Sequence, residues 1–177
     1  MKTVIVPFSE SLTFNEVETL NIDIYKWVNN SYTPRVDVFL CHNNEKLRVK
    51  FIAYEDEISV KAKNDNEKVY CDSCVEFFVR PFDDDLRYVN FEVNPVGSMI
   101  MSINRAKGDS NVLVFKYKAL LNVVTDQQDG QWSVQYEVPF KILSEIYGKS
   151  EILKSGDVIN ANFYKCGDET KEPHFGM

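Results

Sequence analysis

The feature that most constrains the fold of this chain is a succession of short β-rich segments. Many of them alternate apolar and polar residues with period two, and clusters of Asn, Asp, Gly and Pro separate them. We expect strands at residues 36–40, 47–54, 75–80, 88–94, 98–104, 112–124, 132–138 and 158–166.

One helix is expected at residues 140–147, entered after Pro139 and ended by Gly148. Residues 9–34 are expected to be irregular, with a short helical turn around residues 14–20 and a turn near residues 29–34. A parallel sheet would need helical crossovers, for which one helix is not enough.

The length of 177 residues suits one domain with its own hydrophobic core. We therefore predict a single all-β domain over residues 1–177. It is expected to be a two-sheet antiparallel β-sandwich of the immunoglobulin-like or jelly-roll type, with one short helix near residues 140–147.

The charge balance argues against nucleic acid as a partner. Twenty Lys and Arg residues stand against 27 Asp and Glu residues, a net charge of −7, and no basic run interrupts that balance. No stretch of eighteen apolar residues predicts a membrane span. The first residues lack the apolar region of a signal peptide, so we expect a cytoplasmic chain, or a secreted one if a leader has been removed.

Polar side chains with few rotamers share one face of three predicted strands. The alternation places Val75, Phe77 and Val79 on the opposite, apolar face. Asn and Glu each offer two polar atoms, which suits the paired hydroxyls of a sugar. On the first strand Glu76, Phe78 and Arg80 share this face. We favour a binding surface over a plain solvated face for the residues of the other two strands, Tyr88, Asn90, Glu92, Asn94, Asn160, Asn162 and Tyr164.

Four segments in order resemble family 9 of the carbohydrate-binding modules. The first contains Asp72-Ser-Cys-Val-Glu-Phe-Phe78, which is similar to the Asp-Ser-x-Val-Glu-x-Phe strand of the family. The resemblance covers roughly residues 20–175, and the four segments are residues 69–81, 88–97, 130–140 and 156–164. It implies a non-catalytic β-sandwich that recognises a saccharide, at a chain end or as a small sugar.

The resemblance also implies the roles of particular residues. Tyr70 falls where the family places its first aromatic wall, usually a Trp, and Phe175 is the candidate for the second wall. Glu92 stands where sugar-binding members can carry Arg, which reverses a charge beside Glu76. The ligand-binding residues implied are Tyr70, Glu76, Glu92, Asn94, Asn162 and Phe175, with an oligosaccharide or monosaccharide as partner.

Other functions stay open on the same residues. Glu76 and Glu92 could be the paired carboxylates of a glycosidase, although nothing marks one of them as the acid, and we predict no catalysis. A structural or regulatory partner domain of the same fold, having lost sugar binding, is the main rival. Haem ligation is a weaker alternative, because Met on alternating strand positions usually fills a core and His174 lies in a terminus expected to fray. Its candidate ligands are Met99, Met101, His42 and His174.

Metal and cofactor sites have little support in the sequence. Cys71 and Cys74 have C-x-x-C spacing, but no second pair exists, so ordinary reduced thiols are expected. Asp83 to Asp85 and Asp126 to Asp129 supply oxygens in turns, which keeps a structural calcium ion as an alternative to solvated loops. No cofactor and no metal-binding residue are predicted.

Overall fold

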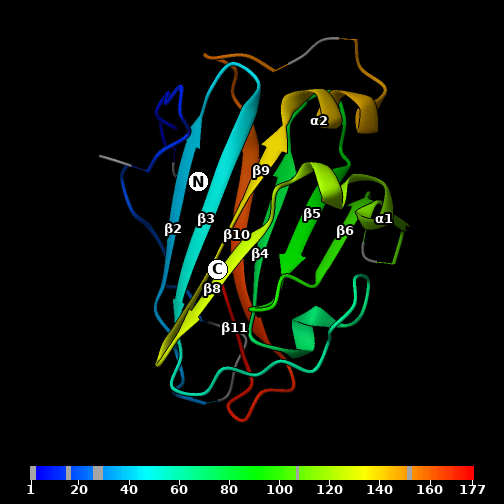
Figure 1. Cartoon of the computed structure of the whole chain (residues 1–177). Coiled ribbons are helices and arrows are strands. Elements are labelled where there is room, and N and C mark those ends of the chain that lie inside the picture. Colours follow the sequence, from blue (N-terminus) through cyan, green and yellow to red (C-terminus); the bar gives the residue numbers. More distant parts are fainter. Residues whose placement is uncertain (1–2, 15–16, 26–29, 107, 151–152) are drawn as a thin grey trace.

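The computed structural model describes residues 3–14, 17–25, 30–106, 108–150 and 153–177. Two antiparallel sheets lie one in front of the other (Figure 1). The front sheet has the order β1-β2-β3-β9-β8 and consists of β1 (Leu20–Ile22), β2 (Val36–His42), β3 (Lys46–Tyr54), β9 (Gln131–Pro139) and β8 (Val124–Gln128).

The second sheet has six strands in the order β11-β10-β4-β5-β6-β7. These are β11 (His174–Gly176), β10 (Asn160–Gly167), β4 (Cys74–Arg80), β5 (Tyr88–Val93), β6 (Met99–Asn104) and β7 (Ser110–Val112). The predicted two-sheet antiparallel β-sandwich is confirmed.

The core lies between the sheets and follows the period-two alternation of the strands. Phe77 and Phe91, on the apolar faces of β4 and β5, are fully buried and stack with ring centroids 5.9 Å apart. Phe77 also stacks on Phe163 of β10 at 5.3 Å, and Phe51 of β3 meets Phe163 edge-on from the other sheet. Because successive side chains point to opposite faces, this packing turns the polar set of the same strands outward.

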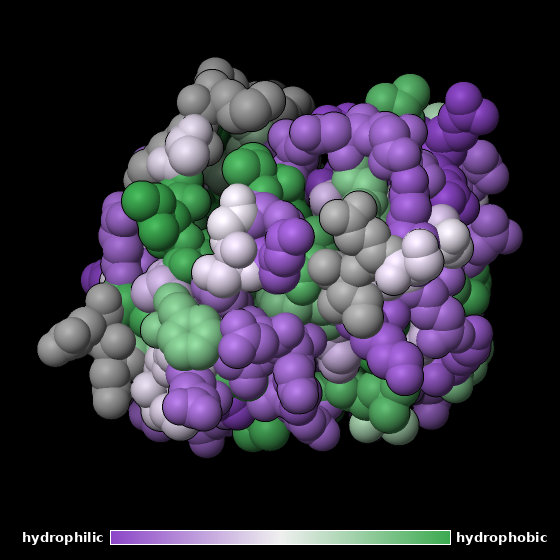
Figure 2. Space-filling view, turned by 90° about the horizontal axis from the view of Figure 1, so that it is seen from above, coloured by the Kyte–Doolittle hydropathy of each residue, from purple (hydrophilic) through white to green (hydrophobic). Residues whose placement is uncertain are grey.

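The predicted helix is present as α2 (Phe140–Tyr147) and closes one end of the sandwich (Figure 1). Gly148 ends it in the left-handed conformation, with φ of 66°, where a glycine has no steric penalty. Figure 2 looks onto this end, where hydrophilic residues are interspersed with separate hydrophobic patches. Within the described part of the chain, no helix has both the length and the apolar character needed to cross a bilayer.

The prediction of one strand over residues 112–124 is wrong. Strand β7 ends at Val112 and is followed by α1 (Val114–Tyr117) and a 3-10 turn, η2 (Lys118–Leu120), before β8 begins at Val124. Val114, Tyr117 and Leu121 are buried. Their spacing of three and four residues is helical, whereas β-branched and aromatic composition alone had favoured a strand.

Both ends of the chain are more regular than expected. The helical turn around residues 14–20 is not seen in its described part, since Leu20 opens strand β1; residues 15–16 lie outside the described residues. The turn expected near residues 29–34 begins at residue 29, which also lies outside the described residues. The terminus expected to fray is instead strand β11, in register with β10, and His174 is buried there.

A buried charged cluster joins the two sheets. Glu55, directly after β3, pairs with Lys165 of β10 at 3.2 Å, and the two side chains are 1% and 0% exposed. The Glu55 carboxylate also accepts hydrogen bonds from Trp132 Nε1 of β9 at 2.5 Å and from Ser73 Oγ at 3.1 Å. We call Glu55, Lys165, Trp132, Ser73 and His174 the buried hub.

His174 brings strand β11 to this hub. Its Nε2 lies 3.7 Å from the Glu55 carboxylate. Burial and the charge of Lys165 lower the pKa of His174 to about 4, so the imidazole is neutral at physiological pH. Gly167 allows this approach, because a Cβ there would lie 2.3 Å from the imidazole Cε1. The last strand therefore places a buried, neutral histidine against the hub.

We expect Lys165→Met to lower the free energy of unfolding by about 3–5 kcal/mol, because it leaves a buried carboxylate without its counter-charge. Urea unfolding followed by tryptophan fluorescence measures this. The double variant Lys165→Met/Glu55→Gln should recover part of the loss. Lys116→Met, which breaks the exposed Lys116–Glu145 pair, is the matched control and should have no measurable effect. Equal stability of Lys165→Met and the wild type would contradict a central role for the hub.

Candidate functional site

The outer face of the six-stranded sheet carries the polar set identified in the sequence. In register across three strands, Tyr164 of β10 lies opposite Glu76 of β4, which lies opposite Glu92 of β5. Directly opposed side chains on one face have Cβ atoms about 4.5–5.5 Å apart. The two glutamates predicted as ligand-binding residues are therefore immediate neighbours, beside a tyrosine ring.

Both glutamates sit in an environment that disfavours their charge. Glu76 is 5% exposed. Burial, and then the charge of Glu92, raise the pKa of the Glu76 carboxyl to about 8. Burial also raises the pKa of half-buried Glu92 to about 7, although Asn90 Nδ2 donates a hydrogen bond to it at 2.5 Å. At neutral pH the pair therefore retains protons that exposed carboxyls would lose.

The two candidate aromatic walls lie on this same face, at the end of the sheet opposite α2. Tyr70 is in the 3-10 turn η1 (Val69–Cys71), just before β4, and its backbone oxygen accepts a hydrogen bond from Asp168 N at 3.1 Å. Phe175 of β11 stacks on Tyr164, with centroids 5.3 Å apart and an interplanar angle of 24°. In Figure 1, β11 and the start of β4 mark this end.

A small apolar cluster connects the two walls. Its buried members are Ala62, Val69, Cys74 and Cys166, and both Tyr70 and Phe175 pack against it while half-buried. Cys166 lies in register between Cys74 and Phe175. Cys74 is two residues before Glu76 on the same face of β4. The structure thus brings Tyr70, Phe175 and Glu76 to one region.

Asn94 does not belong to the exposed part of this site. It is fully buried, and its Nδ2 donates to Ala62 O at 2.8 Å and to the Asp72 carboxylate at 3.0 Å. Its Oδ1 accepts hydrogen bonds from the backbone N–H groups of Val96 and Ser98. The amide has no group left for a ligand, so the implied ligand contact of Asn94 is corrected to a role in shaping the site.

Asn162 lies on the expected face, beyond Tyr164. Its Nδ2 donates to Tyr164 Oη at 2.8 Å and contacts Met177 Sδ at 3.6 Å, and the side chain is half-buried. In register it lies opposite Phe78 rather than Glu76. Its hydrogen bond orients the tyrosine that stands beside the glutamate pair.

Sequence reasoning gave too little weight to three aromatic residues on this face. Phe78 stacks on Tyr88, with ring centroids 5.4 Å apart, and meets Tyr164 edge-on, with centroids 5.0 Å apart. The ring of Tyr164 in turn stacks on that of Phe175. The period-two alternation had placed Phe78, Tyr88 and Tyr164 here, but the family motif directed attention to Tyr70. Together these rings form an aromatic band across the sheet, next to the carboxyl pair.

Asp168, in the turn between β10 and β11, is a further residue that the sequence did not single out. Its charge raises the pKa of both Glu76 and Glu92, and burial raises its own pKa. The only sequence signal was its place after a strand that already carried site residues. It adds a third carboxyl to the same end of the sheet.

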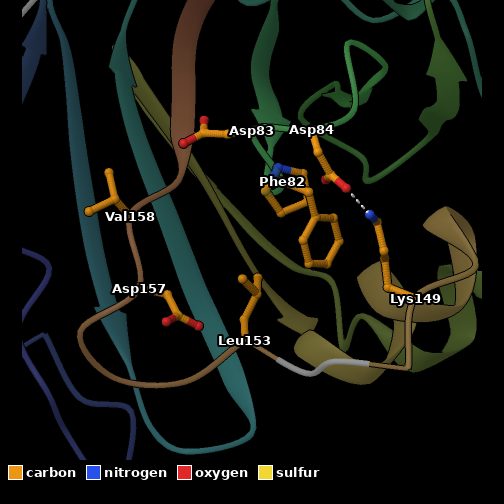
Figure 3. Close-up of a pocket in the computed structure, with 8 residues that line it drawn as sticks. Phe82, Asp83, Asp84, Lys149, Leu153, Asp157 and Val158 are labelled. Atoms are coloured by element: carbon orange, nitrogen blue, oxygen red, sulfur yellow. Dashed lines mark hydrogen bonds and ion pairs between the residues drawn. The ribbon is translucent and has the colours of Figure 1, made fainter.

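Two hollows of about 390 Å³ each lie elsewhere and include none of the predicted site residues. The first, beside α2, is lined in part by Phe82, Asp83, Leu153 and Asp157, and an ion pair between Lys149 and Asp84 lies at its edge (Figure 3). The second is lined mainly by polar residues of the 127–130 turn. Neither combines aromatic walls with buried acceptors as the sheet face does.

The residues considered for metal or haem have other surroundings. Met99 and Met101 are fully buried in the core, and the four cysteines are buried and free. Asp84 pairs with Lys149, and Asp85 with Arg87 at 2.6 Å. Within the residues that the structure describes, no group of three or more His, Cys, Asp or Glu side chains is arranged to hold a metal ion.

Comparison with known proteins gives a consistent relationship. The profile of a family described as carbohydrate-binding family 9 matches residues 7–176. A solved structure of a candidate carbohydrate-binding protein from Bacteroides uniformis is 26% identical, with a TM-score of 0.79, covering 92% of this chain and 77% of that one. A comparison with curated proteins gives no significant match.

A family 9 carbohydrate-binding module from Caldicellulosiruptor kristjanssonii shares the fold at lower identity. Its structure in complex with cellotriose is 14% identical, with a TM-score of 0.69, covering 99% of this chain and 84% of that one. Its structure in complex with glucose is also 14% identical, with a TM-score of 0.69, and the coverage is 99% and 85%.

The raised pKa of Glu76 predicts a dependence of stability on pH. The pKa rises from 4.5 to about 8 on folding, so the folded protein binds more protons than the unfolded chain between these values. Stability therefore falls as pH rises through that window. Glu76→Gln removes the titrating group, so its melting temperature should exceed that of the wild type by several degrees at pH 8 and differ little from it near pH 4.5. A stability difference of about 1 kcal/mol corresponds to roughly 2–4 °C for a chain of this size.

Differential scanning calorimetry across this pH range makes the measurement. Asp129→Asn, on an exposed turn, makes the same change of charge and is the control. Parallel curves of melting temperature against pH for Glu76→Gln and the wild type would contradict the raised pKa.

Proposed function

This chain belongs to carbohydrate-binding family 9, and we propose that it binds a saccharide, without catalysis, on the outer face of its six-stranded sheet. The ligand is a small sugar or the end of an oligosaccharide. Tyr70 and Phe175 contact the ring, and the carboxyls of Glu76 and Glu92 bind its hydroxyls.

One observation carries this proposal: two half-buried aromatic residues lie at the same end of one sheet face as two opposed carboxyls, one buried and one half-buried. A pyranose has C–H faces that pack on aromatic rings and hydroxyls that require hydrogen-bonding partners. The aromatic band supplies the first, and the carboxyl pair supplies acceptors and, when protonated, donors.

The comparisons support the class of ligand. The similar protein from Bacteroides uniformis is a candidate carbohydrate-binding protein, and the module from Caldicellulosiruptor kristjanssonii is in complex with cellotriose and with glucose. Glucose and short β-linked glucose oligosaccharides are therefore the first ligands to test on this chain.

The environment of the glutamates favours binding over hydrolysis. A glycosidase needs one carboxyl held protonated and the other ionised. Here burial raises the pKa of both glutamates in the same direction. We expect no release of nitrophenol from nitrophenyl glycosides above the buffer rate between pH 5 and 8. Turnover that disappears in Glu76→Gln would contradict this proposal and support the glycosidase alternative.

Removing either wall should weaken sugar binding. We expect Tyr70→Ala and Phe175→Ala each to raise the dissociation constant for the sugar about tenfold, because each loses a stacking contact of about 1 kcal/mol or more. Isothermal titration calorimetry with glucose and cellotriose measures this.

Phe115→Ala is the matched control, since Phe115 is 76% exposed on α1 and outside the site. It should bind like the wild type. A wild-type chain that binds none of the sugars tested, although folded by circular dichroism, would instead favour the rival function of a structural or regulatory partner domain.

A further inference from the structure

The acidic groups at one end of the proposed sugar-binding face are carboxyls without a counter-charge among the described residues. Glu76 and Glu92 are directly opposed across β4 and β5, and Asp168 lies close enough to act on both through its charge. The next residue across the sheet from Glu92 is Ile100, which brings no counter-charge. Three carboxyls therefore share one end of this face.

No cation balances them among the residues that the structure describes. None of the ion pairs found there includes Glu76 or Glu92. Lys165 acts weakly on Glu76, but it is paired with Glu55 in the buried hub. Arg80 shares the outer face of β4, yet it is four residues from Glu76, roughly 13 Å along a strand.

The buried glutamate also has an unused acceptor. One oxygen of Glu76 accepts a hydrogen bond from the Cys166 thiol at 2.8 Å, and its other oxygen receives none from the described residues. Burial raises the pKa of the thiols of Cys74 and Cys166 well above their usual range, so these neighbours stay neutral. Burial also raises the pKa of the neighbouring Tyr164 phenol above its usual range, so that group is neutral at physiological pH.

A carboxyl oxygen without a partner among the described residues, on a buried glutamate beside a second carboxyl, matches a ligand that brings its own positive charge. An ammonium donates up to three hydrogen bonds and forms charge-assisted bonds with carboxylates, which are about twice as strong as neutral ones. The ring of Tyr164, next to Glu76, adds a cation–π attraction. A neutral sugar would use neither effect.

Resting on the proposed function, we infer that the preferred ligand is an amino sugar whose protonated amine is held between Glu76 and Glu92. Binding of the cation ionises the pair, so the complex releases protons that the empty face retains. A free amine is required, because acetylation removes both the charge and two of the donors.

Calorimetric titration of the full chain with glucosamine, glucose and N-acetylglucosamine at about pH 6.5 tests the inference. We expect glucosamine to bind at least tenfold more tightly than the other two sugars. Repeating the glucosamine titration in two buffers of different ionisation enthalpy should give different apparent enthalpies, because protons are released on binding.

Two variants distinguish recognition of the amine at this pair from non-specific electrostatic attraction of a cationic sugar to an acidic protein. Glu92→Gln should bring the ratio of glucosamine to glucose affinity close to one. Asp126→Asn, an equal change of charge on the exposed part of β8, should keep the wild-type ratio.

The outcomes distinguish the two proposals. Glucose binding with no preference for glucosamine would overturn the inference and leave the proposed function in place. A preference that Glu92→Gln does not reduce would also overturn it. No binding of any of these sugars, or of cellotriose, would overturn both.

Discussion

The ion pair between Glu55 and Lys165 is the interaction on which the rest of this structure depends. The pair lies between the two sheets. The Glu55 carboxylate also accepts hydrogen bonds from Trp132 of β9 and from Ser73, just before β4. A buried charge is costly unless it is fully paired, so the chain segments that carry these groups are constrained together. His174 adds the last strand to the same point.

Both aromatic walls are neighbours of this hub. Phe175 follows His174 directly, and Tyr70 lies three residues before Ser73. The turn that contains Tyr70 is fixed by the Asp72 carboxylate, which accepts hydrogen bonds from the backbone N–H groups of Lys61 and Ala62 and from the Asn94 side chain. Buried polar groups thus set the spacing of residues that stay half-exposed. Burial raises the pKa of the opposed carboxyls beside them, and perturbed pKa values of this kind are common at functional sites.

Much of the fold, and the set of side chains that share the outer face of the six-stranded sheet, could be predicted from local pattern. Period-two alternation placed Phe77 in the core and Glu76 on the outer face, and it located the central strands. It failed where composition and period disagreed, at Val114 to Leu121, whose burial follows helical spacing. The hub was not predictable, because Glu55 is far in sequence from Lys165 and His174. By alternation Asn94 belongs to the same face as Glu92, and only its burial and its hydrogen bonds, such as that to Asp72, distinguish it.

The proposed binding mode places a sugar ring against Tyr70 and Phe175, above the Glu76–Glu92 pair. An NMR titration of the isotopically labelled chain with glucosamine or glucose tests it most directly, by mapping which signals shift as sugar is added. We expect the largest shifts on residues 70, 76, 92, 164, 168 and 175. Shifts that instead gather around the hollow beside α2, at residues 81–84 and 153–158, would contradict it.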